Sequence, residues 1–443
     1  MPLAVGSGPV PLRHPAAGHL DARAAVRLGL FAAGPSVAAL LVGVAINPAG
    51  LFNDFHSYWY AGRLLAEGTS PYDLEALRTL AARNGDGFTL GTGFSYPLPF
   101  AIAMVPLSAL PFEAAVVLFD AISVAAFATI VVAWLGRFHP TAAAERLGVA
   151  ALAAGSFPPV VGSVLNGQAN LLVTAALAVG AALVLERSAL RAAIGGIAIG
   201  VAAVVKVVPA VLIVPLCLSR LRRGAAASAI AGFVVLFGLA AAIRPGVALD
   251  SGKLAILLGS DPFVTNQSIN GFVSRIVDGS DRLAAALPGA FDPGPVVIVL
   301  TAGFAIATLA ILIRAARRLT TLDGLALGLA LSLVAATAGA PKTSFWNLAM
   351  VLVAVGLLLA ATAPTLEFRA FTRGERRLLV TWWAATLLQP LVWVVPRMPP
   401  GPAAALLVAL GSLSLYGSLA LWWLLGRRLL VDPGADRAPG LTR

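Results

Sequence analysis

A carboxylate surrounded by aromatic residues and a histidine lies just after the first apolar stretch of the chain. Asp54 lies in an aromatic-rich run, followed closely by His56, Tyr58 and Arg63. Partial burial at a membrane interface would raise the pKa of the Asp54 carboxyl toward values useful for a general base. The aromatic rings could stack on sugar faces, although Trp and Tyr are also enriched at interfaces without any catalytic role.

Lys206 is the residue that is hardest to accommodate, because it lies inside an apolar stretch from Ala192 to Ser219. A charged side chain at mid-bilayer costs about 2.5–3.5 kcal/mol on insertion scales. It should therefore face a cavity and have a partner. An anionic phosphate is one candidate partner, and Asp120 in a neighbouring apolar segment is the structural alternative.

Other polar groups are clustered in the predicted outer loops and turns. Arg275 could bind a phosphate through two parallel hydrogen bonds, or pair with Asp278 or Asp281. Lys342 could neutralise an anion or simply lie at the lipid headgroups. Amide and phenol groups that could bind sugar hydroxyls stand in the remaining polar turns: Tyr96, Gln168, Asn170, Asn266 and Gln267.

Several kinds of chemistry lack the residues they need. The sequence has no phosphate-binding P-loop, no dinucleotide-binding glycine motif and no Asp-x-Asp pair to hold a metal under a nucleotide diphosphate. Its four histidines do not cluster, and a single cysteine, Cys217, cannot form a disulfide framework. We therefore expect no metal and no cofactor.

The composition predicts an all-α membrane protein. Of the 443 residues 59% are hydrophobic and 12% are charged, with a mean hydropathy of +0.90. A net charge of +11 is better explained by basic cytoplasmic loops than by nucleic acid. About ten apolar segments are long enough to span a bilayer: 27–47, 112–135, 147–164, 170–186, 225–243, 295–313, 322–340, 345–362, 378–396 and 402–426.

The stretch around Lys206 does not fit this alternation of spans. It has arginines at both ends, so both ends should face the cytoplasm, and it contains Pro209. We predict two half-helices that meet at Lys206, as a broken or re-entrant element. Short helices at Leu64–Glu67 and Leu74–Ala82, and an interfacial segment at Phe100–Leu110, are expected in the first outer loop.

The distribution of basic residues predicts the orientation and the organisation of the chain. With the N-terminus inside, 21 of the 31 Lys and Arg residues fall in inner segments. The chain then has a cytoplasmic tail at 1–26, a transmembrane domain at 27–426 with outer loops at 48–111 and 244–294, and a second cytoplasmic tail at 427–443. A composition rich in Ala, Gly, Val and Arg suggests a bacterial protein, hence the plasma membrane.

The order of these motifs resembles that of glycosyltransferase family 87. The resemblance rests on Asp54-Phe55, Tyr58, Ala61-Gly62-Arg63 and Pro71-Tyr72-Asp73 in the first outer loop. It continues through Phe94-x-Tyr96-Pro97, Gly167-Gln168-x-Asn170, Lys206 with Pro209, and Asn266-Gln267-Ser268. Each motif is weak alone, and together they cover about residues 50–350.

The resemblance implies a GT-C fold and a hexosyltransferase that takes a sugar, most simply mannose, from a polyprenyl monophosphate. The acceptor would be a glycolipid or glycan of the cell envelope, on the extracytoplasmic side. Asp54 would be the general base of an inverting displacement, with Lys206, Arg275 and Lys342 on the donor phosphate. His56, Tyr58, Arg63, Tyr96, Gln168, Asn170, Asn266 and Gln267 would bind substrate.

Two alternatives remain: an arabinofuranosyltransferase of the same family, or a transporter or flippase of lipid-linked sugars, which the broken element at Lys206 would also suit. The sequence also departs from the family at the late outer turn. Many members carry histidines there, whereas this chain has Ser344-Phe345-Trp346-Asn347. Lys342 could replace the cationic role, the donor or acceptor could differ, or the protein could be an inactive scaffold.

Overall fold

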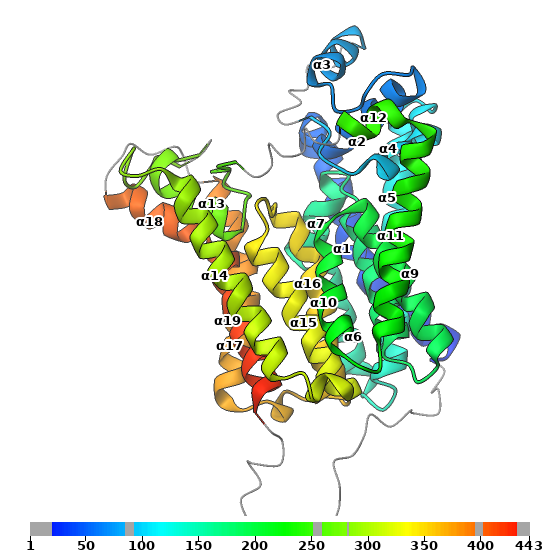
Figure 1. Ribbon diagram of the computed structural model, residues 1–443, viewed down its shortest axis with the longest axis vertical. Helices are drawn as coiled ribbons and strands as arrows, with labels where there is room; N and C mark the ends of the chain where they lie inside the picture. The colour runs from blue at the N-terminus through cyan, green and yellow to red at the C-terminus, as the bar shows by residue number, and fades with distance from the viewer. Residues whose placement is uncertain (1–19, 85–92, 251–258, 281–282, 395–401, 432–443) are drawn as a thin grey trace, which may run out of the picture.

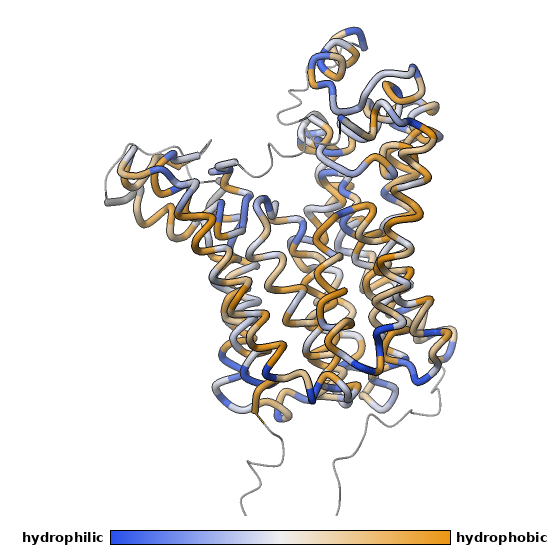
Figure 2. The backbone as a smooth tube through the Cα atoms, in the orientation of Figure 1, coloured by the Kyte–Doolittle hydropathy of each residue, from blue (hydrophilic) through white to orange (hydrophobic). Residues whose placement is uncertain are grey.

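The computed structural model describes residues 20–84, 93–250, 259–280, 283–394 and 402–431. The described chain is helical apart from its turns and an isolated antiparallel bridge between Asn266 and Ser344. The helices form a bundle with an apolar middle and more polar ends (Figure 1 and Figure 2). This arrangement is typical of a multi-pass membrane protein, because backbone polar groups in lipid must be paired within helices.

Within the described ranges, six helical segments are long and apolar enough to cross a membrane. They are α1 (Ala22–Ile46), α5 (Phe112–Phe138), α11 (Arg223–Ile243), α14 (Pro293–Arg314), α15 (Leu322–Gly339), and η5 (Phe345–Met350) continued by α16 (Val351–Thr362). A seventh crossing results if α6 (Ala144–Gly155) and α7 (Pro158–Leu165), which meet at 46°, count as one bent span.

The predicted ten full spans are not confirmed, because several apolar segments form shorter helices. These are α8 (Asn170–Val184), α17 (Arg373–Leu388) with η7 (Gln389–Val394), and α18 (Pro402–Leu410). Helix α19 (Leu413–Leu430) has 18 residues but is not among the six apolar segments. The prediction of one continuous span over 402–426 was wrong, since the helix is interrupted after Leu410. The carbonyl oxygen of Gly411 at this break accepts hydrogen bonds from the amides of Gln267 and Gln389, at 2.8 and 3.0 Å.

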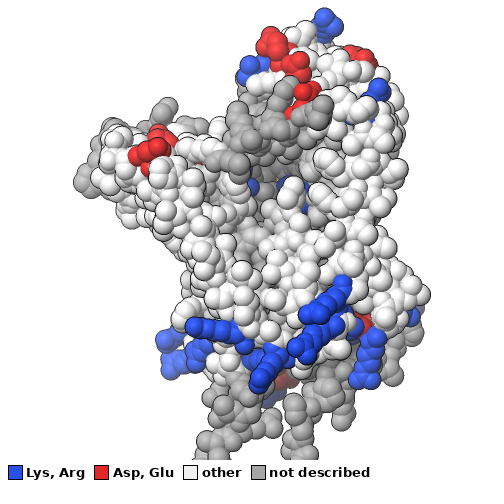
Figure 3. All heavy atoms as spheres, in the orientation of Figure 1, with Lys and Arg blue, Asp and Glu red and all other residues white. Residues whose placement is uncertain are grey.

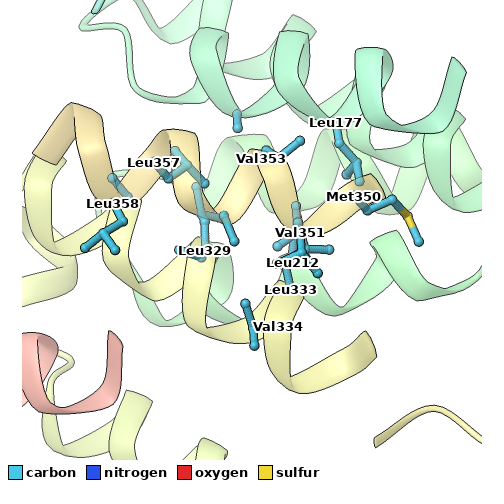
Figure 4. Close-up of a cluster of buried hydrophobic side chains, with 14 of the residues drawn as sticks. Leu177, Leu212, Leu329, Leu333, Val334, Met350, Val351, Val353, Leu357 and Leu358 are labelled. Carbon is cyan, nitrogen blue, oxygen red and sulfur yellow. The ribbon is translucent and has the colours of Figure 1, made fainter. Parts of the chain in front are cut away.

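Central and peripheral helices differ in what they bury. Helix α15 is mostly enclosed by other helices. Together with α16 it contributes most of the labelled side chains in the buried hydrophobic cluster of Figure 4. By contrast, α1, α11 and α14 turn large apolar side chains outward, among them Leu41, Val234 and Ile298. Such faces are stable only in contact with lipid, which places these three helices at the periphery of the bundle.

The predicted break at Lys206 is confirmed. Helix α9 (Ala189–Val205) ends at Val205, and Lys206 itself has an extended backbone. The chain continues as η2 (Val208–Leu212) and α10 (Ile213–Leu218). It also returns to its starting level, because the guanidinium of Arg222, which follows α10, donates a hydrogen bond to the carbonyl of Glu186, which precedes α9. The element is therefore re-entrant.

The segment between α1 and α5 is more helical than predicted. Helix α2 (Asn53–Ala66) begins eleven residues before the predicted Leu64–Glu67, so Asp54 lies on a helix rather than in a loop. Helices α3 (Leu74–Arg83) and α4 (Leu98–Ser108) match the other two predicted elements closely. Helix α4 packs tightly on α2, because a Cβ at Gly62 would lie 2.8 Å from the carbonyl oxygen of Met104.

The two ends of the bundle differ in charge. The described chain begins at α1 and ends at α19 on the same end, where Lys and Arg side chains form a band (Figure 1 and Figure 3). At the other end, α12 (Pro245–Asp250) lies near α2, α3 and α4, while α13 (Ile269–Asp278) and α18 form a separate arm. A hollow lies between these two parts in Figure 3, and Lys or Arg atoms are visible inside it.

Helix α9 is held at close range by its neighbours, and this contact is testable. A Cβ at Gly196 would lie 2.1 Å from the carbonyl oxygen of Ala225 on α11. Replacing Gly196 with Ala should push the two helices apart and lower the free energy of unfolding by about 1–3 kcal/mol, as for other overpacked sites. The measurement is thermal unfolding of the purified protein in detergent.

Gly238 on α11 is the matched control, because no heavy atom lies within 4 Å of the Cβ it would acquire. Gly238→Ala should be neutral or slightly stabilising, since alanine favours helix more than glycine does. Equal melting temperatures for Gly196→Ala and the unaltered protein would contradict the close approach.

Candidate functional site

Asp54 lies in the first turn of α2, at a helix start that the rest of the chain helps to fix. The residue before this helix, Phe52, has a left-handed backbone with φ of 61°, which is rare for a bulky residue. The carbonyl oxygen of Asn166 accepts hydrogen bonds from the backbone N–H groups of Asp54 and Phe55, at 3.1 and 3.3 Å. The positive end of the helix dipole favours a negative charge in this first turn.

Gly167 allows the turn between α7 and α8 to approach α2. It has φ of +62°, and a Cβ at this position would lie 2.6 Å from the Cβ of Phe55. Any other residue would be strained in this backbone conformation and would also clash with α2. The turn therefore delivers the next residue, Gln168, directly to the Asp54 carboxylate.

Gln168 connects the carboxylate to the other polar groups of the site. Its Nε2 donates a short hydrogen bond to Oδ2 of Asp54. Its Oε1 accepts hydrogen bonds from the hydroxyls of Tyr96 and Tyr58, at 2.9 and 3.2 Å, and lies 3.4 Å from Nζ of Lys206. Because a carboxylate only accepts, the amide orientation of Gln168 is fixed, and one side chain links the anion to the cation.

The two tyrosines keep this network in a single arrangement. The single proton of the Tyr58 hydroxyl is shared between Oη of Tyr96, at 2.6 Å, and the more distant Oε1 of Gln168, and the two tyrosine rings meet edge to face. Burial raises the pKa of both phenols well above their ordinary value, and the negative charge of Asp54 acts in the same direction. Both hydroxyls therefore stay protonated and act as donors at neutral pH.

Lys206 is surrounded by neutral groups. Its Nζ donates to Oδ1 of Asn170 and, at 2.5 Å, to Oδ1 of Asn347, and it lies 5.4 Å from the centre of the Tyr96 ring. Within the described ranges, no salt bridge joins Lys206 to a carboxylate. The negative charge of Asp54 acts on Lys206 electrostatically. The positive charge of Lys206 is therefore held by neutral oxygens and not by a bonded carboxylate.

The predicted structural partner of Lys206 was wrong. Asp120 is buried on α5, but neither of its carboxylate oxygens has a hydrogen-bond partner among the described residues. It therefore does not neutralise Lys206, which leaves the anionic ligand as the remaining candidate from the sequence.

Asp54 is set deep in the molecule but is not sealed, and both Asp54 and Lys206 keep part of their surface accessible. Burial raises the pKa of the Asp54 carboxyl above 3.8, while the hydrogen bond from Gln168 and the charges of Lys206 and Lys342 lower it, with burial dominating. A carboxylate with a raised pKa and an open side can act as a base.

Three further predicted residues lie near this cluster but outside its hydrogen bonds. Lys342 acts on Asp54 through its charge and pairs with Asp261 at 3.5 Å. Nδ1 of His56 lies 3.0 Å from the carbonyl oxygen of Phe52, and the imidazole packs on Phe112. The Arg63 guanidinium lies over the Trp59 ring at 4.7 Å.

Arg275, Asn266 and Gln267 belong to a different, fully buried network. Nη1 of Arg275 donates to the carbonyl oxygens of Phe263 and Asn266 at 2.7 and 2.8 Å, and Nη2 donates to Oγ of Ser412 at 2.6 Å. The Gln267 amide donates to backbone carbonyls, including that of Gly411. These groups hold together the arm that contains α13 and α18, and they are not brought to Asp54. Asp281, offered as a partner of Arg275, lies outside the described residues.

The same network reaches the late outer turn. The backbone N–H of Gln267 donates to Thr343, that of Phe345 donates to Thr265, and Oδ1 of Asn266 accepts from the N–H of Thr343. These bonds fix the start of η5, which carries Asn347 to Lys206.

Asn347 is the one member of the polar cluster that sequence reasoning did not propose. It lies in the short polar turn from Pro341 to Asn347, in which only Lys342 was predicted to act in the site. The signal was available, because a buried lysine requires oxygen acceptors and this turn offers one.

The described residues include no group of three or more His, Cys, Asp and Glu side chains that could hold a metal ion.

Comparison with known proteins identifies the family. The sequence model of glycosyltransferase family 87 matches residues 94–338, which is more than half of the chain. The match includes Tyr96, Gln168 and Lys206, whereas Asp54 and Asn347 lie outside it. No curated protein matches the chain significantly. The chain belongs to glycosyltransferase family 87 and is a multi-pass membrane glycosyltransferase.

Proposed function

We propose that the protein transfers a sugar from a polyprenyl monophosphate to a glycolipid or glycan acceptor, with mannose as the sugar and arabinofuranose as the alternative. The observation that carries this proposal is the pairing of two groups across Gln168: a half-open carboxylate, Asp54, and a cation without a paired carboxylate, Lys206. The first suits an acceptor hydroxyl and the second suits a phosphate.

The reaction needs one displacement. Asp54 takes the proton from the acceptor hydroxyl, and that oxygen attacks the anomeric carbon of the donor sugar. The bond from this carbon to the phosphate oxygen breaks, and the polyprenyl phosphate leaves with the electron pair. Lys206 stabilises the negative charge that develops on the leaving phosphate. A single carboxylate and a single displacement invert the anomeric configuration.

The other predicted site residues take different parts in this proposal. Gln168 orients the base, with Tyr58 and Tyr96 holding its amide. Asn170 and Asn347 fix the ammonium of Lys206. Lys342 adds positive charge near Asp54, whereas Arg275, Asn266 and Gln267 support the arm and are not assigned to substrate. His56 and Arg63 are left as candidates for contact with the acceptor.

The proposed location is the plasma membrane of a bacterium, with both termini in the cytoplasm and the site outside. The band of Lys and Arg at the end of the bundle opposite α2 supports this orientation, because cytoplasmic loops carry an excess of basic residues. The transmembrane region from 27 to 426 would then act as one domain, flanked by short cytoplasmic tails.

Asp54→Asn tests the base directly. The variant keeps the size and an acceptor oxygen but cannot take a proton, so transfer from polyprenyl-phosphate mannose should fall by about a hundredfold to ten-thousandfold. The assay uses purified protein in detergent with a lipid acceptor and follows the new glycolipid by mass spectrometry. Donor binding should persist.

Asp73→Asn is the matched control, because Asp73 caps α3 through its side chain and asparagine caps a helix equally well. It should transfer at the normal rate. Full transfer by Asp54→Asn would remove Asp54 from the mechanism, and sugar uptake into liposomes without any transfer would favour a transporter.

Lys206→Met tests the phosphate site. Methionine fills a similar volume without charge, and the loss of a charged hydrogen bond costs about 1.5–3 kcal/mol, or roughly tenfold to a hundredfold in kcat/KM for the donor. The partly exposed Lys342, which pairs with Asp261, provides the comparison, and Lys342→Met should have a smaller effect. Equal donor kinetics for Lys206→Met and the unaltered protein would contradict a phosphate at Lys206.

The pH dependence follows from the environment of Asp54. Transfer needs the ionised carboxylate, so activity is present above the pKa of Asp54 and is lost as the pH falls through it. Since burial raises that pKa, the acid limb of kcat/KM should lie above pH 3.8. Lys206 and Lys342 lower it, so removal of either charge should move the limb to higher pH. An unchanged limb in both lysine variants would contradict this coupling.

A further inference from the structure

A large cavity lies in the bundle away from the polar cluster. Its volume is about 760 Å³, and it is enclosed by α5, α6, α8, α16 and α17. On α8 its lining begins at Thr174, one turn beyond Asn170, and continues to Ala178 toward the basic end. Neither Asp54 nor Lys206 lines it. The cavity is therefore separate from the proposed transfer site.

The depth of the cavity matches one leaflet of a bilayer. On α5 its lining extends from Phe127 to His139, the residue after the helix. Twelve residues at a helical rise of about 1.5 Å span about 18 Å. Half of a hydrocarbon core of about 30 Å is about 15 Å. The cavity thus runs from the level of the basic band to roughly the middle of the membrane.

The mouth of the cavity opens sideways toward lipid. Val149, Val380 and Leu387 line it and are also largely exposed on the outside of the bundle. Deeper in, the walls are aliphatic and aromatic, with Phe127 and Trp382 among them. An apolar space that opens through valines and leucines within the bilayer is suited to acyl chains.

A buried donor without a partner marks the level at which such a chain would join its headgroup. Trp134 lines the cavity and is 8% exposed, yet its Nε1–H has no hydrogen-bond partner among the described residues. Buried polar groups are nearly always paired. Trp134 is five residues before His139, so its indole lies just below the rim, at the depth of the ester carbonyls of a phospholipid.

The rim of the cavity carries charges of both signs. Arg146, Glu145 and Glu367 line it, and Nη1 of Arg146 lies 2.8 Å from Oε1 of Glu367. Arg369 also pairs with Glu367, so two guanidinium groups and two carboxylates lie together here. A headgroup that contains both a phosphate and an ammonium complements this set, with its phosphate toward Arg146 and its ammonium toward the carboxylates. A purely anionic headgroup would meet two like charges.

We propose that this cavity is a binding site for one phospholipid of the leaflet at the basic end, of the phosphatidylethanolamine class. Its acyl chain lies along α5 and α8, an ester carbonyl accepts the Trp134 N–H, and the headgroup meets Arg146, Glu145 and Glu367. The site does not depend on the sugar, the donor or the transfer reaction proposed above.

The test uses the full chain, purified in mild detergent and stripped of lipid, then titrated with phosphatidylethanolamine or phosphatidylglycerol. Native mass spectrometry counts the bound lipid, and thermal unfolding reports its effect. We expect one tightly retained phosphatidylethanolamine per chain. Ala154→Leu, which fills the cavity from α6, should abolish retention. Trp134→Phe should weaken it by about fivefold, as for the loss of one hydrogen bond.

Two controls separate binding from folding. Ala133→Leu, on the exposed side of α5 and outside the lining, and Trp423→Phe, at an exposed position of α19, should both bind as the unaltered protein does. Gel filtration establishes that each variant is monodisperse. Undiminished retention by monodisperse Ala154→Leu, or equal or tighter binding of phosphatidylglycerol, would overturn the assignment.

Discussion

The structure depends on the placement of one positive charge inside an apolar bundle. Lys206 can remain there only if oxygen atoms surround its ammonium, because an unpaired charge in such surroundings is strongly disfavoured. Three separate elements supply those oxygens: the start of α8, the turn before it, and η5. Because α9 ends at Val205, the Lys206 side chain can reach these oxygens. Gln168, which accepts from Lys206, also donates to Asp54. Asp54 and Lys206 therefore belong to one hydrogen-bond network.

Sequence reasoning succeeded where a residue is costly for a physical reason. Lys206 in an apolar stretch with arginines at both ends predicted a broken, re-entrant element, and α9, η2 and α10 have that form. The position of Asp54 at a membrane interface stays a prediction, and the structure places the residue in the first turn of α2. The amide turn at Gly167 was visible as a candidate, although its role in orienting Asp54 required the left-handed backbone and the contact with Phe55.

Other features could not be inferred, because sequence does not say what a polar side chain faces. Arg275 in an outer loop has the same appearance whether it meets a phosphate or the backbone carbonyls of its own loop, and here it binds the carbonyls. Asn347 was overlooked for the converse reason, since its partner lies far away in the sequence. The number of spans could not be predicted either, because apolar composition does not reveal the interruption at Gly411. There the carbonyl oxygen accepts hydrogen bonds from the side-chain amides of Gln267 and Gln389.

The antiparallel bridge between Asn266 and Ser344 connects the arm of α13 and α18 to the turn that holds the ammonium of Lys206. Thr343 and Phe345 are hydrogen-bonded to the segment before α13, and Asn347, whose amide oxygen binds Lys206, lies two positions after Phe345. A shift of the arm would thus pull directly on the coordination of the cation. A few backbone hydrogen bonds thus connect the arm to the lysine inside the bundle.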